Sequence, residues 1–136
     1  MPVEICVRLE FDSAHRLYPY EGKCANIHGH NYRVDVGVVG ELDHRGIVAD
    51  FGDLKNHFSY LVDSVLDHTL ILNSYDPLVA PLSDLGVSML LLEGSPTAEN
   101  IAQYIFEEFE TLLSNDELKL SFVRVYETDN NYAEYR

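Results

Sequence analysis

The chain has 136 residues, which at roughly 150 residues per domain predicts a single domain over residues 1–136. Hydrophobic residues make up 46% and charged residues 24%, a balance that excludes an intrinsically disordered chain. The formal charge of -14 excludes general binding to nucleic acid or to an anionic membrane. No apolar run reaches the ~18 residues of a membrane span, no secretory signal begins the chain, and two cysteines are too few for a disulfide scaffold. We therefore expect a cytoplasmic protein.

The first part of the chain predicts two long strands. Apolar and polar residues alternate over residues 3–11 and again over residues 32–39, as they do in strands with one buried face. After a turn, residues 47–49 are expected to form a further short strand. Asp50 then offers a side chain that caps a helix beginning at Phe51.

Two helices are expected in the middle of the chain. Apolar residues recur every three or four positions over residues 51–66, which places them on one face of a helix. Residues 73–95 are rich in turn-forming residues, with an apolar run at 87–92 that can form an extra short strand. The second helix is predicted to begin near residues 95–97, because Ser or Thr caps free N–H groups and Pro is tolerated in a first turn.

The C-terminal part returns to strand character. Residues 119–127 alternate, turn-forming residues follow at 129–131, and residues 132–136 are expected to close a hairpin as a final strand. The predicted order is therefore strand, strand, helix, helix, strand, strand. This order indicates an α+β fold over the whole chain.

Three histidines are candidate metal ligands. His28 and His30 stand at positions i and i+2, so their side chains point to the same side of an extended segment. His15 follows the first strand and reaches the same place if the two long strands pair as antiparallel neighbours. Three imidazoles supply three ligands of a tetrahedral Zn2+ site and leave the fourth position open, as in catalytic zinc sites. The alternative is that these are ordinary histidines near turns, since an isolated His-x-His pair does not decide between the two.

Cys24 lies in a polar loop four residues before His28. A thiol beside Lys23 and a divalent cation is biased toward the thiolate, the form that acts as a base or a nucleophile. The alternative is that Cys24 is a fourth zinc ligand, which would make the site closed and structural.

Asp67 and His68 follow the first predicted helix directly. A carboxylate beside an imidazole suits proton transfer, but neighbours in sequence need not hydrogen-bond to each other. The alternative is a histidine that caps the end of its own helix.

Glu127 ends a strand whose inward positions are apolar. A buried carboxylate needs partners, and a pterin-like or guanine-like ring offers two adjacent N–H donors that would compensate for its desolvation. The alternative is that Glu127 is simply the first polar residue past the strand.

Five separated segments resemble motifs of one family, the 6-pyruvoyltetrahydropterin and 6-carboxytetrahydropterin synthases. They occur in the order of the family and span nearly the whole chain apart from residues 73–93. The segments are Phe11-Asp12-Ser13-Ala14-His15-Arg16-Leu17, Cys24-Ala25-Asn26-Ile27-His28-Gly29-His30-Asn31-Tyr32, Leu66-Asp67-His68, Pro96-Thr97-Ala98-Glu99-Asn100 and Tyr126-Glu127-Thr128. Together they make the resemblance more specific than any single motif.

The resemblance implies the tunnelling fold, a four-stranded antiparallel sheet with two helices on one face in the order ββααββ. In that family three subunits join their sheets into a barrel and two trimers stack. The implied assembly is therefore a homohexamer with active sites between subunits.

The resemblance also implies roles for individual residues. His15, His28 and His30 take the positions of the Zn2+ ligands, Cys24 that of the catalytic cysteine, Asp67 and His68 those of its acid–base partners, and Glu127 that of the pterin anchor. Thr97 and Glu99 fall in the substrate-contacting segment, with helix capping as the alternative duty of Thr97. Because an acidic chain must hold an anionic substrate, we expect Lys23, Arg16 or a basic residue of another subunit to meet the triphosphate.

The implied substrate is 7,8-dihydroneopterin triphosphate, used without nicotinamide or flavin. Three residues separate Cys24 from His28, a spacing similar to that of 6-carboxytetrahydropterin synthases, which release acetaldehyde and triphosphate on the route to queuosine and deazapurines. Residues 126–131 also resemble 6-pyruvoyltetrahydropterin synthases, which keep the side chain and eliminate only triphosphate. The carboxy product is therefore expected, with the pyruvoyl product as the alternative.

Two other functional classes remain open. A zinc hydrolase would use the same open metal position without needing Cys24. A non-catalytic pterin-binding or purine-binding oligomer would keep Glu127 and tolerate the loss of zinc.

Overall fold

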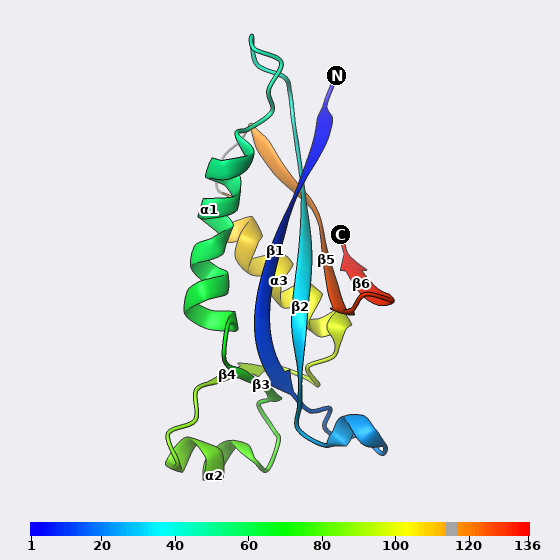
Figure 1. Cartoon of the computed structure of the whole chain (residues 1–136), viewed down its shortest axis with the longest axis vertical. Helices are drawn as coiled ribbons and strands as arrows, with labels where there is room; N and C mark the ends of the chain where they lie inside the picture. Colours follow the sequence, from blue (N-terminus) through cyan, green and yellow to red (C-terminus); the bar gives the residue numbers. More distant parts are fainter. Residues whose placement is uncertain (114–116) are drawn as a thin grey trace.

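The computed structural model describes residues 1–113 and 117–136, and Figure 1 shows one long twisted sheet with helices beside it. The strands are β1 (Val3–His15), β2 (His28–Gly40), β3 (Leu70–Asn73), β4 (Met89–Leu92), β5 (Leu118–Thr128) and β6 (Asn131–Tyr135). The helices are α1 (Phe51–Leu61), α2 (Val79–Asp84) and α3 (Ala98–Leu112), with a 3-10 turn η1 (Lys23–Ala25) and a π-helical turn η2 (Val62–Leu66). None of the helices in these described ranges is both long and apolar enough to span a membrane.

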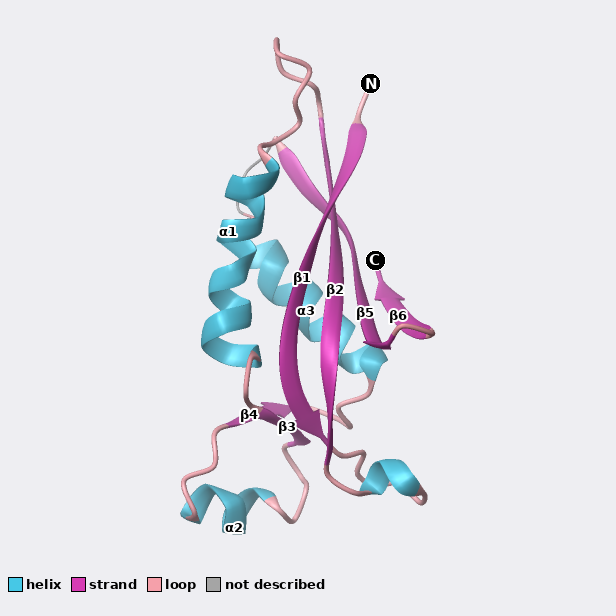
Figure 2. Ribbon diagram, viewed as in Figure 1, coloured by secondary structure: helices cyan, strands magenta, loops and turns pink. Residues whose placement is uncertain are grey.

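The two longest strands form the centre of the sheet. β1 and β2 pair antiparallel from Val3 opposite Gly40 to His15 opposite His28. β5 pairs with β2 and β6 with β5, both antiparallel, whereas β3 and β4 extend the other edge as parallel strands beside β1 (Figure 2). The order is β4-β3-β1-β2-β5-β6. The four expected strands are present, but the expectation of a four-stranded antiparallel sheet is wrong, because the sheet that the described residues form is mixed and has six strands.

One of the two added strands, β3, escaped prediction because its residues show no alternation of apolar and polar side chains. All four residues of β3 are buried, so the strand appears in the sequence as a continuous apolar run of only Leu-Ile-Leu. Such a short run cannot be distinguished from a loop or a helix end by periodicity. β4 lies within the apolar run at residues 87–92, where an extra strand was expected.

Helices α1 and α3 cover one face of the sheet, as expected (Figure 1). Phe58 of α1 stacks on Phe109 of α3, with ring centroids 4.3 Å apart, and both side chains are fully buried. The inward rows of the strands complete this core with Val7, Leu9, Phe11, Tyr32, Val34, Val36, Val38, Val123 and Val125. The apolar patterns that predicted these elements are therefore the patterns that build the core.

The loop between β2 and α1 differs from the expectation in one respect. Residues 47–49, predicted as a short strand, form no strand. The Asp43 side chain accepts the N–H of Ile47, and the backbone N–H of Asp43 donates to the Ile47 carbonyl. The backbone N–H and carbonyl of Ile47 are therefore used within a turn and do not pair with a neighbouring strand. The expected cap of α1 is confirmed, since Asp50 accepts the N–H of Asp53 at 3.0 Å.

The segment before α3 is fastened to the end of β1 by a buried ion pair. Arg16 Nε donates to Asp76 Oδ2 at 2.7 Å, and the Asp76 side chain is fully buried. Asp76 also accepts the N–H of Leu78, and Asn73 donates to the carbonyl of Tyr18. These contacts give the segment at residues 76–94 a structural attachment right beside His15.

The Asp76 carboxylate is predicted to stabilise the fold in a pH-dependent way. Hydrogen bonds from Arg16 lower the pKa of Asp76, so its contribution is present above its unfolded pKa of about 4 and is lost as the pH falls through the lower folded value. Asp76→Ala, which leaves Arg16 unpaired, is expected to cost about 3 kcal/mol of unfolding free energy at pH 7, and less below pH 4. Urea unfolding of the wild type and the variant at pH 7 and at a pH below 4 measures this difference in unfolding free energy.

The matched control for this variant is Asp84→Ala, which removes an exposed carboxylate from the same segment. Substitutions of this kind usually change stability by less than about 0.5 kcal/mol. An Asp76→Ala protein no less stable than Asp84→Ala would contradict the role of the buried pair.

Candidate metal centre and active site

Three histidine side chains meet at one end of the core. His15 lies at the end of β1, directly opposite His28 on β2, and His30 is two residues further along the same strand. The alternation of the strands places all three on the face that carries the core. Their ligand atoms all lie within 4.8 Å of one another, so the structure brings the three expected metal ligands together as a histidine triad (His15, His28, His30).

Backbone carbonyls set the tautomers of two triad members. His15 Nδ1 lies 2.7 Å from the carbonyl oxygen of Pro96, and His28 Nδ1 lies 2.7 Å from that of Asn26. Because a carbonyl oxygen only accepts, each Nδ1 carries the proton and each Nε2 keeps a lone pair. The two Nε2 atoms face each other 3.1 Å apart, an arrangement that a bound cation stabilises.

The third triad member, His30, has a ring nitrogen without a hydrogen bond in the part of the chain that the structure describes. His30 Nε2 is buried and has no hydrogen-bond partner among the described residues, although buried polar atoms normally have one. Burial lowers the pKa of His15 and that of His30, which keeps both rings in the neutral form that binds metal. Three imidazoles whose ligand nitrogens lie this close together fit Zn2+, and they leave its fourth position open.

Glu127 lies beside the triad at the end of β5. Its Oε2 is 3.9 Å from His30 Nε2, and about a third of its side chain is exposed. It borders a cavity of about 380 Å3 together with Thr97 and Glu99. The structure therefore brings the three expected substrate-contacting residues of this region to one cavity next to the candidate metal centre.

Thr97 also caps α3. Its Oγ1 accepts the N–H of Asn100 at 3.1 Å, which satisfies one of the free donors of the first helical turn. The capping duty considered for Thr97 is thus confirmed, and the residue lines the cavity as well.

Asp67 and His68 form a hydrogen-bonded pair just after the π-helical turn η2. The Asp67 N–H reaches back five residues to the Val62 carbonyl, and His68 has a left-handed backbone with φ 59°. Asp67 Oδ1 accepts the N–H of Asp12 at 2.9 Å, and Asp67 Oδ2 lies 2.8 Å from His68 Nδ1. The Asp12 N–H and then His68 lower the pKa of Asp67, and Asp67 raises the pKa of His68.

His68 of this pair borders a different hollow from the one that Glu127 borders. A groove of about 570 Å3 is bordered by His68, Asp12, Asn31 and His30, among others. His30 thus lies between this groove and Glu127. Within one chain, the candidate acid–base pair and the candidate anchor lie on two sides of the triad.

Cys24 lies in η1 on the loop between β1 and β2. Its side chain is half-buried and makes no hydrogen bond with the described residues, while its carbonyl accepts the N–H of Leu17 at 2.8 Å. Its sulfur is not part of the cluster in which the triad nitrogens meet. The alternative of Cys24 as a fourth metal ligand therefore gains no support from the geometry.

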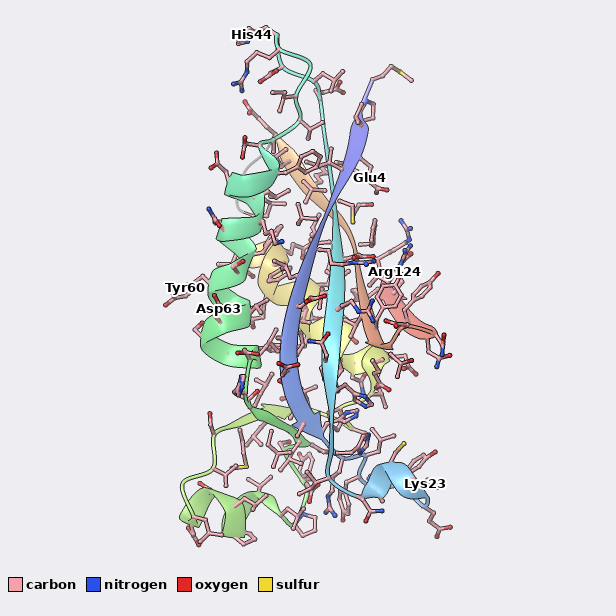
Figure 3. All side chains as sticks on the ribbon, in the orientation of Figure 1. Glu4, Lys23, His44, Tyr60, Asp63 and Arg124 are labelled. Atoms are coloured by element: carbon pink, nitrogen blue, oxygen red, sulfur yellow. The ribbon has the colours of Figure 1, made fainter. Side chains whose placement is uncertain are left out.

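Lys23 points into solvent next to Cys24 (Figure 3). Every arginine of the chain forms an ion pair with a carboxylate, whereas Lys23 forms none with any residue in 1–113 or 117–136. Arg16, the other cation expected at the triphosphate, is held by Asp76. Lys23 is therefore the uncommitted cation on the loop that carries Cys24.

Sequence reasoning missed the groups that orient the triad and the Asp67 carboxylate. The carbonyls of Asn26 and Pro96 and the N–H of Asp12 are backbone groups, which no residue type announces. It also missed the hydroxyl of Tyr32, which is buried near His30 without a hydrogen-bond partner among the described residues, and burial raises the pKa of this phenol. The position of Tyr32, two residues after His30 in the inward row, was the available signal.

Comparisons with known proteins show the family of the chain. The family model described as 6-pyruvoyl tetrahydropterin synthase matches residues 4–136. The chain is 34% identical over 131 residues to the 6-carboxy-5,6,7,8-tetrahydropterin synthase of Rickettsia bellii, covering 93% of this chain and 95% of the relative. It is 35% identical over 146 residues to the 6-pyruvoyl tetrahydrobiopterin synthase of Homo sapiens, covering 98% and 90%.

A solved structure shows the same fold. The 6-pyruvoyl tetrahydropterin synthase of Caenorhabditis elegans superposes with a TM-score of 0.74 at 30% identity, covering 100% of this chain and 96% of that one. The family model, the relatives and this structure each extend over nearly the whole chain. The chain therefore belongs to the 6-pyruvoyl tetrahydropterin synthase family of lyases.

Proposed function

We propose that the chain is a zinc-dependent 6-carboxy-5,6,7,8-tetrahydropterin synthase. It would convert 7,8-dihydroneopterin triphosphate and water to 6-carboxytetrahydropterin, acetaldehyde and triphosphate. The observation that carries the proposal is the histidine triad, whose inward lone pairs lie beside Glu127 and the cavity that it borders. The relative from Rickettsia bellii and the spacing of three residues between Cys24 and His28 favour the carboxy product.

Each group of residues in the site has its own role in the proposed reaction. Bound zinc supplies Lewis acidity that makes a coordinated hydroxyl more acidic. Glu127 accepts two N–H groups of the pterin ring, and the triad fixes the side chain of the substrate relative to that anchor. Cys24 and the Asp67–His68 pair receive and return the protons that leave and rejoin the side-chain carbons.

The proposal includes a homohexamer built as a dimer of trimers, with sheets that join into barrels. His68 borders the groove on one side of the triad, and Glu127 borders the cavity on the other. A neighbouring subunit that brings its own pair to the Glu127 side would complete one active site, and this arrangement suits sites between subunits.

The second candidate is a 6-pyruvoyltetrahydropterin synthase, which would eliminate triphosphate and retain the whole side chain. The relative from Homo sapiens, at 35% identity, favours it, as does the likeness of residues 126–131 to such enzymes. The two reactions give different pterins, and only the carboxy reaction releases acetaldehyde.

Product identification tests the proposed reaction. The zinc-loaded protein is incubated anaerobically with 7,8-dihydroneopterin triphosphate, and the pterin and any acetaldehyde are identified by mass spectrometry. Carboxytetrahydropterin with an equal amount of acetaldehyde is expected. A pyruvoyl product without acetaldehyde would establish the second candidate, and unchanged substrate would contradict both.

Removal of one triad imidazole is expected to remove the metal. His28→Ala leaves two ligands, so zinc measured by atomic emission after dialysis should fall from about one per chain to below a tenth, and activity should fall ~100-fold or more. His44→Ala, which removes an exposed histidine at the tip of the loop between β2 and α1, is the control and should keep both (Figure 3). Full zinc content in His28→Ala would contradict the metal centre.

Charge reversal at Lys23 is expected to weaken binding of the triphosphate. Lys23→Glu should raise KM by about 5- to 10-fold with little change in kcat, and the effect should shrink as salt is added. Steady-state kinetics at two ionic strengths measure it. Lys55→Glu reverses an exposed charge on α1 and should leave KM unchanged, so equal effects in both variants, or none in either, would exclude a local contact at Lys23.

A further inference from the structure

The cavity beside Glu127 is lined on one side by an aromatic ring that packs against no other ring of the described residues. Tyr20 lines this cavity, its side chain is 53% exposed, and it makes no ring contact or side-chain hydrogen bond with the described residues. Tyr132 also borders the cavity, but its ring already packs under the Arg124 guanidinium at 4.6 Å and against Tyr126 at 5.1 Å. Among the described residues, no other ring or guanidinium packs on the ring of Tyr20, whereas the ring of Tyr132 contacts both.

A glycine makes room for the Tyr20 ring. Gly22 has φ 134°, a conformation that L side chains rarely adopt. A Cβ at Gly22 would lie 3.1 Å from Tyr20 Cε2, closer than ordinary carbon contacts allow. The ring thus lies over bare backbone, and a side chain at Gly22 would force it to shift by a few tenths of an ångström.

The loop that carries Tyr20 is closed on itself. The Leu17 N–H donates to the Cys24 carbonyl at 2.8 Å, and the Ala25 N–H donates to the Gly22 carbonyl at 3.1 Å. Tyr20 and the candidate catalytic thiol of Cys24 therefore lie on one backbone unit, which ends next to Asn26, the carbonyl partner of His28.

The other walls of the cavity call for a particular kind of ligand. Glu127 and Glu99 supply carboxylates, whereas Leu17 and Ala98 supply apolar surface. A flat heterocycle with N–H groups along one edge satisfies both, because its edge pairs with a carboxylate while its face covers apolar or aromatic surface. Stacking on an aromatic side chain adds affinity in proportion to the overlapping ring area.

On the basis of the proposed function, we propose that Tyr20 stacks on the bicyclic ring held by Glu127 and so selects two-ring heterocycles over one-ring heterocycles with the same N–H edge. Tyr20 acts here as a specificity residue. Its ring, rather than its hydroxyl or its bulk, carries the effect.

The test compares two ligands that share the N–H edge. Neopterin has both rings, and 2-amino-4-hydroxypyrimidine has only the ring that faces the carboxylate. Dissociation constants of both are measured by ligand-observed NMR on the zinc-loaded protein. Tyr20→Leu should weaken neopterin about tenfold and the pyrimidine less than about twofold, whereas Tyr20→Phe should bind both as the wild type does.

Two further variants distinguish a failure of the stacking role of Tyr20 from a failure of the proposed pocket. Tyr75→Leu removes a tyrosine that is 83% exposed and outside the cavity, and it should bind both ligands normally. Glu127→Gln should lose both. If Glu127→Gln loses both ligands but Tyr20→Leu keeps its neopterin affinity or loses the two ligands equally, the stacking role is overturned and the proposed pocket stands. If the wild type does not bind neopterin, or Glu127→Gln binds it unchanged, the proposed pocket is overturned and the stacking role with it.

Discussion

The antiparallel pairing of β1 with β2 is the constraint on which the rest of the molecule depends. Its inward row buries Phe11 and Tyr32 in the core and, further along, carries His15, His28 and His30. Because the side chains of a strand alternate with a period of two, a slip of one residue would turn the whole row outward. Burial of the apolar part of the row therefore fixes the register that brings the candidate metal ligands together.

Elements with a repeating pattern could be predicted from the sequence, and those without one could not. The alternation of apolar and polar residues in β1 and β2 and the apolar stripes of α1 and α3 each repeat over many residues. Such long patterns rarely arise by chance. β3 is short and buried throughout, so it leaves no alternating trace. Residues 47–49 have the composition of a strand, but the side chain of Asp43 holds the backbone there in a turn.

The candidate site could likewise be predicted only in part from the sequence. Spacing and residue type predicted the triad, and the adjacency of Asp67 and His68 predicted a pair that does hydrogen-bond. What the sequence could not show is how tertiary packing distributes these groups, with the pair on one side of His30 and Glu127 on the other. Nor could it reveal the carbonyls that set the histidine tautomers, since every residue carries that acceptor.

The hydrogen bond from His15 to the Pro96 carbonyl joins positions 81 residues apart, whereas the partner of His28 is only two residues away. His28 and His30 share one strand, which sets their relative orientation, whereas His15 is oriented by the packing of the segment before α3 in the native fold. An ion that requires all three imidazoles is then bound by the native state alone. Through thermodynamic linkage, its binding free energy becomes part of the stability of the fold.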